Sequence, residues 1–216
     1  VFNSKMAVVF DSVEYEETGR LIYQNGWLNF FQTGPHREPL YPALIALSMS
    51  CANFLSTDYQ LVLKVLQVIA LFITQILLMI ILRKFNIREW VIMAAVFYFG
   101  ISPAMINAAF SLYYEIVVFP FVALAVLLAG SLWFDIHKKI SCGLILGKAM
   151  IFAACFSLLA FGRDLFQYVF YFFITPFCIS VFWSLFTRRL LVLRRLLVFI
   201  CAAFIIFYSS VSYFKS

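Results

Sequence analysis

The sequence from Asp11 to Pro42, DSVEYEETGRLIYQNGWLNFFQTGPHREPLYP, is a polar stretch near the start of this 216-residue chain, and an apolar remainder follows it. Burying unpaired ionised groups in hydrocarbon costs kilocalories per group, so this stretch must lie in water or at a membrane surface. It carries five of the ten carboxylates, namely Asp11, Glu14, Glu16, Glu17 and Glu38. The stretch therefore indicates a polar loop attached to a membrane-embedded region.

The composition excludes a soluble globular domain. Hydrophobic residues make up 65% of the chain, charged residues only 12%, and the mean hydropathy is +1.00, whereas charged residues are about a quarter of a typical soluble domain. The chain is therefore predicted to be an all-α integral membrane protein with several transmembrane helices. Its net charge of +6 is explained by basic loops beside the membrane, so no nucleic-acid partner is expected.

Two juxtamembrane helices are expected in the first loop. Residues 11–25 favour a helix with Asp11 as N-cap and Glu14 at the third helical position, and Gly26 ends it. A second helix, interfacial or re-entrant, is expected over residues 39–55. The first helix has too few apolar residues to span a bilayer, so it is expected to lie on the membrane surface. Aromatic side chains follow it as interfacial anchors, namely Trp27, Phe30 and Phe31.

Residues 58–216 are predicted to form a transmembrane bundle, and residues 1–57 to form the polar loop with its two helices. Apolar segments of about 20 residues can cross ~30 Å of hydrocarbon at 1.5 Å per residue. Prolines inside three of the segments are tolerated in membrane helices, where they often mark kinks. Six spans are predicted, at 59–82, 90–110, 115–134, 144–161, 165–186 and 196–214.

The basic residues predict the orientation of the chain. Ten of the 16 lysines and arginines fall in three alternate connections, at 83–89, 135–148 and 187–195. Cytoplasmic loops carry such an excess of basic residues, so these connections are predicted to be cytoplasmic. The first loop and eight of the ten acidic residues then face the other side. The four arginines of the last connection are expected to anchor the chain to anionic lipid and not to form a site.

Several polar motifs are expected on this outer side, beginning with Asp11 and Tyr15, then HREPLYP at 36–42, Glu115 and Arg163. The arrangement resembles the GT-C superfamily of lipid-phosphate-sugar-dependent glycosyltransferases, which includes protein mannosyltransferases and bacterial aminoarabinose transferases. In that family the first extracytoplasmic loop begins with an acidic residue followed by a tyrosine, runs through two juxtamembrane helices and contains a Pro-Leu motif. Asp11, Tyr15 and the sequence EPLYP stand in those positions here.

The resemblance implies an enzyme that moves a sugar from a polyprenyl-phosphate carrier to a lipid, glycan or protein acceptor. It implies that Asp11 is the catalytic base and that Glu115 is the family's second acidic position. Without the resemblance, Asp11 is better explained as a helix N-cap, and Glu115 equally well as an acid at a helix N-terminus. No second acid directly follows Asp11, and metal dependence varies within the family. A divalent metal is therefore neither required nor excluded.

Cations are expected near the phosphate of the carrier, because they stabilise its developing charge. Arg163 lies between two spans at the outer boundary, and Lys64 lies one or two turns inside its span. Pairing with Asp164 or snorkelling to lipid phosphate explains Arg163 at least as well. The other substrate-binding candidates come from the first loop and its helices, namely Tyr15, His36, Arg37, Glu38 and Tyr41.

The resemblance also implies where the protein is located. Two other functional classes are considered as alternatives to a glycosyltransferase. It favours a bacterial inner membrane with the active site outside, and an apolar segment of ~20 residues upstream of Val1, so the chain is expected to be a fragment. A transporter or flippase subunit would carry ionisable residues at the membrane midplane on broken helices. Those of this chain are predicted at the outer boundary, which disfavours transport. A GT-C-like scaffold without activity is the second alternative.

Overall fold

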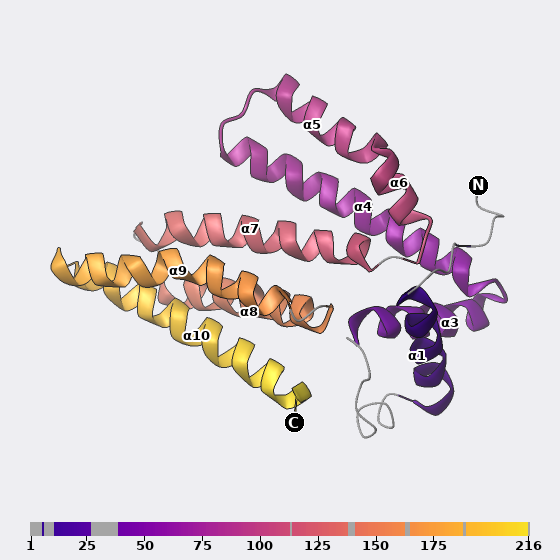
Figure 1. The fold of residues 1–216 in the computed structure, drawn as a ribbon. Coiled ribbons are helices and arrows are strands. Elements are labelled where there is room, and N and C mark those ends of the chain that lie inside the picture. Colours follow the sequence, from indigo (N-terminus) through magenta and orange to yellow (C-terminus); the bar gives the residue numbers. More distant parts are fainter. Residues whose placement is uncertain are drawn as a thin grey trace. The chain divides into compact units, whose positions relative to one another are not determined.

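A computed structural model (Figure 1) describes residues 6, 11–26, 39–112, 114–137, 141–162, 165–187 and 189–215. Nearly all of these residues are helical, and no strand occurs among them, so the all-α prediction is confirmed. The chain divides into two compact units, Val1–Pro120 and Phe121–Ser216, because most residue contacts are made within each unit. The predicted division after residue 57 separates a surface loop from a membrane region, and it stays a prediction.

The first helix, α1 (Asp11–Asn25), covers the predicted range. Gly26 ends it with a φ of +82°, a conformation that favours glycine, and the Gly26 N–H donates to the Ile22 carbonyl at 2.9 Å. The next described helix, α3 (Leu40–Leu55), begins one residue later than predicted because Pro39 is its N-cap. The predicted cap of Asp11 and the three aromatic anchors involve side chains outside the described residues.

Helices α1 and α3 pack closely against each other (Figure 1). Gly19 faces α3 closely, since a Cβ atom built on it would stand 2.7 Å from Ile45 Cγ2 and 3.1 Å from the Pro42 carbonyl oxygen. One turn further along, Ile22 and Ala46 are each 2% exposed and pack together. The glycine that is unfavourable for an isolated helix therefore permits the contact between the two helices of the first loop.

The first helix long and apolar enough to cross a membrane is α4 (Tyr59–Lys84). The chain then returns through α5 (Glu89–Ile101) and α6 (Pro103–Ala109), which are bent by 50° relative to each other. The single span predicted at 90–110 is therefore two helices. The break occurs at Ser102–Pro103 because proline lacks the N–H that would continue the helical hydrogen bonds.

Three contacts between α4 and the returning segment give an antiparallel register. From the turn towards the start of α4 they are Arg83 with Glu89 (3.0 Å), Gln75 with the Val96 carbonyl (3.4 Å) and Gln67 with the Ser111 carbonyl (3.2 Å). Positions 67 to 83 of a helix span about 24 Å at 1.5 Å per residue. The bent pair thus follows most of the length of α4, which favours one bent crossing over a re-entrant loop.

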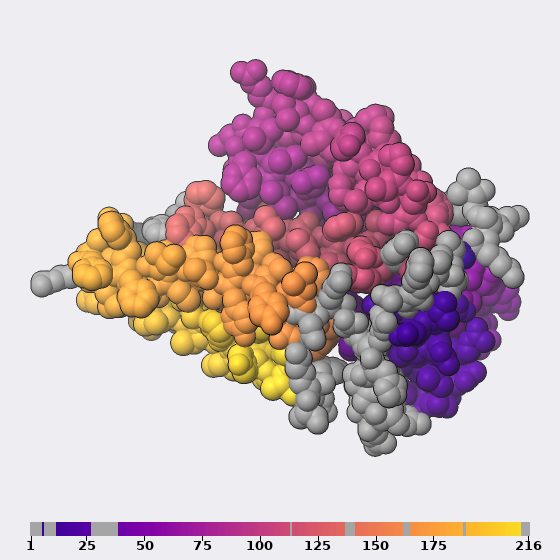
Figure 2. Space-filling view, viewed as in Figure 1, coloured from indigo at the N-terminus to yellow at the C-terminus, as the bar shows by residue number. Residues whose placement is uncertain are grey.

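The second unit contains most of α7 (Glu115–His137), with α8 (Cys142–Gly162), α9 (Leu165–Phe186) and α10 (Leu190–Lys215). Helix α10 packs against both α8 and α9, and Figure 2 shows α9 and α10 as adjoining surfaces. The core is aromatic: the rings of Phe170 and Phe207 stack with centroids 4.0 Å apart. Four further buried phenylalanines belong to this core, namely Phe152, Phe156, Phe177 and Phe199.

Several charges predicted in connections of this unit lie in helices. Helix α10 starts before its predicted span, so Arg194 and Arg195 are helical, as is consistent with the high helix propensity of arginine. Asp135 lies on α7 and Lys148 on α8, where the two side chains form an ion pair that Ser131 Oγ joins by accepting from Lys148 Nζ at 2.8 Å. Pairing explains why these two charges are tolerated inside apolar helices.

Five helices in the described ranges are long and apolar enough to cross a membrane, and the bent pair α5–α6 would make a sixth crossing. Their outward faces are apolar, as lipid requires. Large hydrophobic side chains between 59% and 75% exposed include Phe72, Phe97, Phe172, Phe182 and Ile205. The fold therefore fits an integral membrane protein.

Candidate functional site

Aromatic and polar side chains of the first unit gather where α1, α3, α4 and the start of α7 meet. Tyr15 and Tyr41 are edge to face with ring centroids 5.6 Å apart, and Tyr15 lies 6.2 Å from Tyr114. Tyr15 is 6% and Tyr41 2% exposed, so both are buried. We call Tyr15, Tyr41, Gln67, Tyr114 and Glu115 the tyrosine cluster.

Gln67 of α4 holds the cluster together. Its Nε2 donates to Tyr41 Oη at 2.8 Å and to the Ser111 carbonyl oxygen at 3.2 Å. Gln67 is completely buried, and a buried amide that lacked such partners would cost ~1–3 kcal/mol. The two hydrogen bonds therefore tie α3 and the segment after α6 to one position on α4.

Glu115 is the first residue of α7, where a negative charge is favourable. Burial raises the pKa of Tyr41 above its ordinary value and the charge of Glu115 raises it further, although the hydrogen bond from Gln67 opposes this. Tyr41 is therefore neutral at physiological pH, with Glu115 close by. Glu115 Oε2 is buried and accepts no hydrogen bond from the described residues. A bound hydroxyl or amine can donate to this oxygen.

Lys64 lies on the same face of α4 as Gln67, one turn closer to the start of the helix. Its side chain is only 2% exposed, and the adjacent Leu63 packs against Tyr15 and Tyr41. At 1.5 Å per residue Lys64 lies about 8 Å inside the helix, at the depth that was predicted. A buried ammonium group has to be balanced by negative or polar groups.

A second set of polar contacts joins α1 to the start of α4. Tyr59 Oη donates to Glu16 Oε1 at 2.6 Å, and Arg20 Nη2 lies 3.2 Å from the same oxygen. Asp58 caps α4 by accepting from the Gln60 N–H at 3.0 Å. None of these contacts was predicted, and neither was Gln67. The sequence did contain a signal for Gln67, because an amide side chain within an apolar segment needs hydrogen-bond partners when it is buried.

The described candidates lie close together in the first unit, although their functional roles stay predictions. Tyr15, Tyr41 and Glu115 belong to the tyrosine cluster, and Lys64 lies one turn away from Gln67. Asp11 is the first residue of α1, but its side chain is not among those described. Four other candidates lie outside the described residues, namely His36, Arg37, Glu38 and Arg163.

Within the described ranges, no three His, Cys, Asp or Glu side chains are grouped so that they could hold a metal ion. His36 and Glu38 were not part of those ranges. All five cysteines are free thiols. The divalent metal that the resemblance allows therefore has no ligand set in the described part of the chain.

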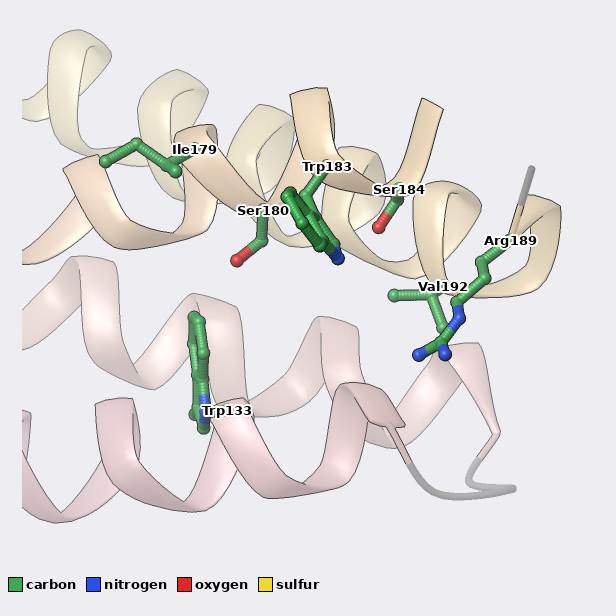
Figure 3. A pocket seen from close by; sticks show the side chains of 7 residues that line it. All are labelled: Trp133, Ile179, Ser180, Trp183, Ser184, Arg189 and Val192. Atoms are coloured by element: carbon green, nitrogen blue, oxygen red, sulfur yellow. The ribbon is translucent and has the colours of Figure 1, made fainter. Parts of the chain in front are cut away.

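Two pockets lie away from the tyrosine cluster. One of about 310 Å³ lies between α4 and α5, with Gln75 as its polar side chain among apolar ones. The other, of about 350 Å³, lies in the second unit and is drawn in Figure 3. Neither is lined by a residue of the tyrosine cluster. The cluster residues pack against one another in this structure.

Comparison of the chain with protein-family models, with curated proteins and with solved structures found no match. The resemblance to glycosyltransferases thus rests on short motifs and their order along the chain.

Proposed function

We propose that this chain is the membrane module of a glycosyltransferase that takes a sugar from a polyprenyl-phosphate carrier and transfers it to an acceptor outside the cytoplasm. The observation that carries the proposal is the buried Glu115 Oε2, which accepts no hydrogen bond within the described part and lies close to Tyr41. A carboxylate in that state is suited to receive a proton from, or to orient, an acceptor hydroxyl or amine.

In the proposed reaction, the acceptor oxygen or nitrogen attacks the anomeric carbon of the sugar as the bond from that carbon to the phosphate oxygen breaks. The phosphate leaves with the bonding electrons, and the proton of the acceptor goes to a carboxylate. Asp11 is the base that the resemblance implies, and Glu115 is the second acid. Lys64 and Arg163 are the proposed cations for the departing phosphate.

A transporter or flippase subunit is the second candidate, and the broken pair α5–α6 favours it because transporters bind substrates at discontinuous helices. The break lies beside the middle of α4, since Leu71, Gly100 and Ile101 line one pocket. That pocket contains Gln75 but no ionisable side chain. Coupling to an ion normally uses ionisable residues at such a position, so we rank transport below sugar transfer.

The test is consumption of defined donors by the full-length protein in lipid vesicles. Polyprenyl-phosphate mannose and polyprenyl-phosphate aminoarabinose are the probes, a membrane extract supplies acceptors, and released polyprenyl phosphate is measured. We expect Glu115→Gln to lower the rate at least ~100-fold, because general base catalysis is worth ~10²–10⁴-fold. Glu17→Gln is the matched control, since Glu17 is exposed on α1, and its rate should stay within about twofold. Wild-type rates in Glu115→Gln would contradict the assigned role.

Asp11 allows a sharper comparison because its two explanations respond differently to asparagine. A helix cap tolerates Asp11→Asn, since Asn accepts the same backbone hydrogen bond, whereas Asp11→Ala costs ~1 kcal/mol. A base does not tolerate Asn, which takes up no proton. We expect Asp11→Asn to keep its melting temperature and to lose nearly all transfer. A variant that transfers sugar at the wild-type rate would show that Asp11 is only a cap.

A further inference from the structure

A pocket of about 350 Å³ opens in the second unit where α9 ends and α10 begins (Figure 3). Trp133 comes from α7 and Trp183 from α9, and Arg189 directly precedes α10. In Figure 3, Trp133 lies across the pocket from Trp183, and the Arg189 guanidinium points into the same space. The pocket thus combines two indole rings with one cation.

Backbone hydrogen bonds hold Arg189 in place. Its N–H donates to the Ser184 carbonyl at 3.1 Å, and its own carbonyl accepts from the Leu193 N–H at 3.0 Å in the first turn of α10. On the opposite wall, the Trp133 ring packs edge to face on Phe177 with centroids 5.6 Å apart. The backbone of Arg189 and one of the indoles are therefore positioned by the fold before any ligand binds.

The surroundings of the pocket are positive. Residues 165–216 include no acidic residue, but they include four arginines between 188 and 195. The acid closest in sequence to Trp133 is Asp135, which is paired with Lys148. The Arg189 guanidinium forms neither a hydrogen bond nor an ion pair with any described residue. The neighbouring Arg195 Nη1 donates to the Ile136 carbonyl at 3.2 Å. Arg189 is consequently available for an external anion.

We propose that this pocket binds the phosphate headgroup of an anionic membrane lipid. Arginine presents a fork of N–H donors that fits phosphate, and tryptophan prefers the depth of the lipid headgroups. The volume lies at the lower end of ligand pockets, ~300–1,000 Å³, and suits a headgroup with its first methylenes. The acyl chains then follow the apolar face of α9, where Ile179 is 63% exposed. The proposal is independent of the sugar transfer proposed above.

The pocket suits a lipid better than free phosphate. Ser180 uses its hydroxyl hydrogen for the Pro176 carbonyl at 2.9 Å, and Ser184 is buried. The Arg189 guanidinium is the one charged group among the lining residues, and most of the remaining lining is apolar. A free phosphate ion would leave most of its oxygens without donors there, but a lipid also gains contact between its chains and the helices.

The test uses the two tryptophans of the pocket as reporters. Replacing Trp27 and Trp90 by Phe leaves Trp133 and Trp183, whose fluorescence is quenched by bromine atoms on lipid chains. The purified chain is placed in phosphatidylcholine vesicles that contain increasing fractions of brominated phosphatidylglycerol or brominated phosphatidylcholine. We expect saturable quenching, with an affinity for phosphatidylglycerol ~10-fold or more above that for phosphatidylcholine. A charge-assisted hydrogen bond of ~1.5–3 kcal/mol accounts for a preference of that size.

Substitutions at two arginines of the same basic segment distinguish lipid binding in the pocket from general attraction of anionic lipid to the surface charge. Arg189→Gln should remove most of the preference and Arg189→Lys should retain part of it. Arg194→Gln, which changes an exposed arginine that does not line the pocket, should stay within about twofold of the parent chain. Unchanged quenching by brominated phosphatidylcholine shows that the tryptophans of each variant keep their general contact with lipid chains. Equal losses in Arg189→Gln and Arg194→Gln would overturn the proposal, and so would relief of quenching by millimolar inorganic phosphate.

Discussion

Gln67 and Tyr41 show how single polar residues are accommodated in this apolar chain. The amide of Gln67 donates to the hydroxyl of Tyr41 and to a backbone carbonyl, and both side chains are buried. Each side chain supplies the hydrogen-bond partner that the other one requires when it is buried. The pair therefore connects α3 to α4 through a contact whose loss can be measured.

Tyr41→Phe should lower the free energy of unfolding by about 1 kcal/mol, since one hydrogen bond to a buried amide is lost. Gln67→Leu should cost a similar amount, because it leaves the Tyr41 hydroxyl buried without this donor. The double substitution should cost less than the sum of the two, which denaturant unfolding in detergent can measure. Strictly additive losses would contradict the hydrogen bond between these side chains.

The ion pair of Asp135 and Lys148 predicts a second non-additive result. Its side chains are 14% and 25% exposed, so Asp135→Asn leaves a partly buried ammonium without its carboxylate and should cost ~2 kcal/mol. Replacing both, as Asp135→Leu with Lys148→Met, should recover most of that loss. The exposed pair of Arg83 and Glu89 is the matched control, and Glu89→Gln should change stability by less than ~1 kcal/mol. Similar losses in both pairs would contradict this account.

Packing between elements depends most visibly on Gly19. Alanine is the better helix former by ~1 kcal/mol, but its Cβ would lie 2.7 Å from Ile45 Cγ2 and must push α1 away from α3. Gly19→Ala should therefore destabilise the first loop, which limited proteolysis and thermal unfolding can detect. Gly147→Ala on α8 is the control, because no atom lies within 4 Å of its added Cβ, and it should stabilise. Stabilisation by both substitutions would show that α1 and α3 do not approach this closely.

The helices also show how far sequence patterns predict structure. The ranges of α1 and α3 were predicted within one residue at their ends, because glycine and proline at these ends act through the local backbone. The prolines were less informative: the chain breaks before Pro103, whereas Pro120 and Pro176 lie inside continuous helices. Whether a proline breaks a helix depends on whether neighbouring groups supply hydrogen bonds to the backbone groups that the proline leaves unpaired. The tertiary structure decides this, and the local sequence does not show it.

For the candidate site, the sequence could indicate which residue types belong to it. Tyr15, Tyr41 and Glu115 were singled out from motifs, and Lys64 as the one charge in its predicted span. All four lie near one another in the first unit. Gln67, which bonds to Tyr41, was missed because an amide within an apolar run has no motif of its own. Asp135 and Lys148 were assigned to a connection, since charges usually end a span, and only the paired geometry explains their position in helices.

At the scale of the whole chain, the sequence predicts that most acids lie on one side of the membrane and most basic residues on the other. The two acids on the basic side, Glu89 and Asp135, are each paired with a basic residue. The bent pair α5–α6 runs antiparallel to α4, so a single bent crossing would bring Glu115 back to the side of Tyr59. A re-entrant loop would leave α7 to begin on the other side. The sidedness of the tyrosine cluster is consequently the central claim.

The most direct test is labelling of single cysteines in intact cells with a membrane-impermeant maleimide. In a chain whose five native cysteines are replaced by alanine, we expect Gln32→Cys, Thr57→Cys and Asn107→Cys to be labelled from outside. Asn86→Cys, in the turn between α4 and α5, should be labelled only after the membrane is permeabilised. Labelling of Asn86→Cys from outside, with protection of Thr57→Cys and Asn107→Cys, would contradict an extracytoplasmic site.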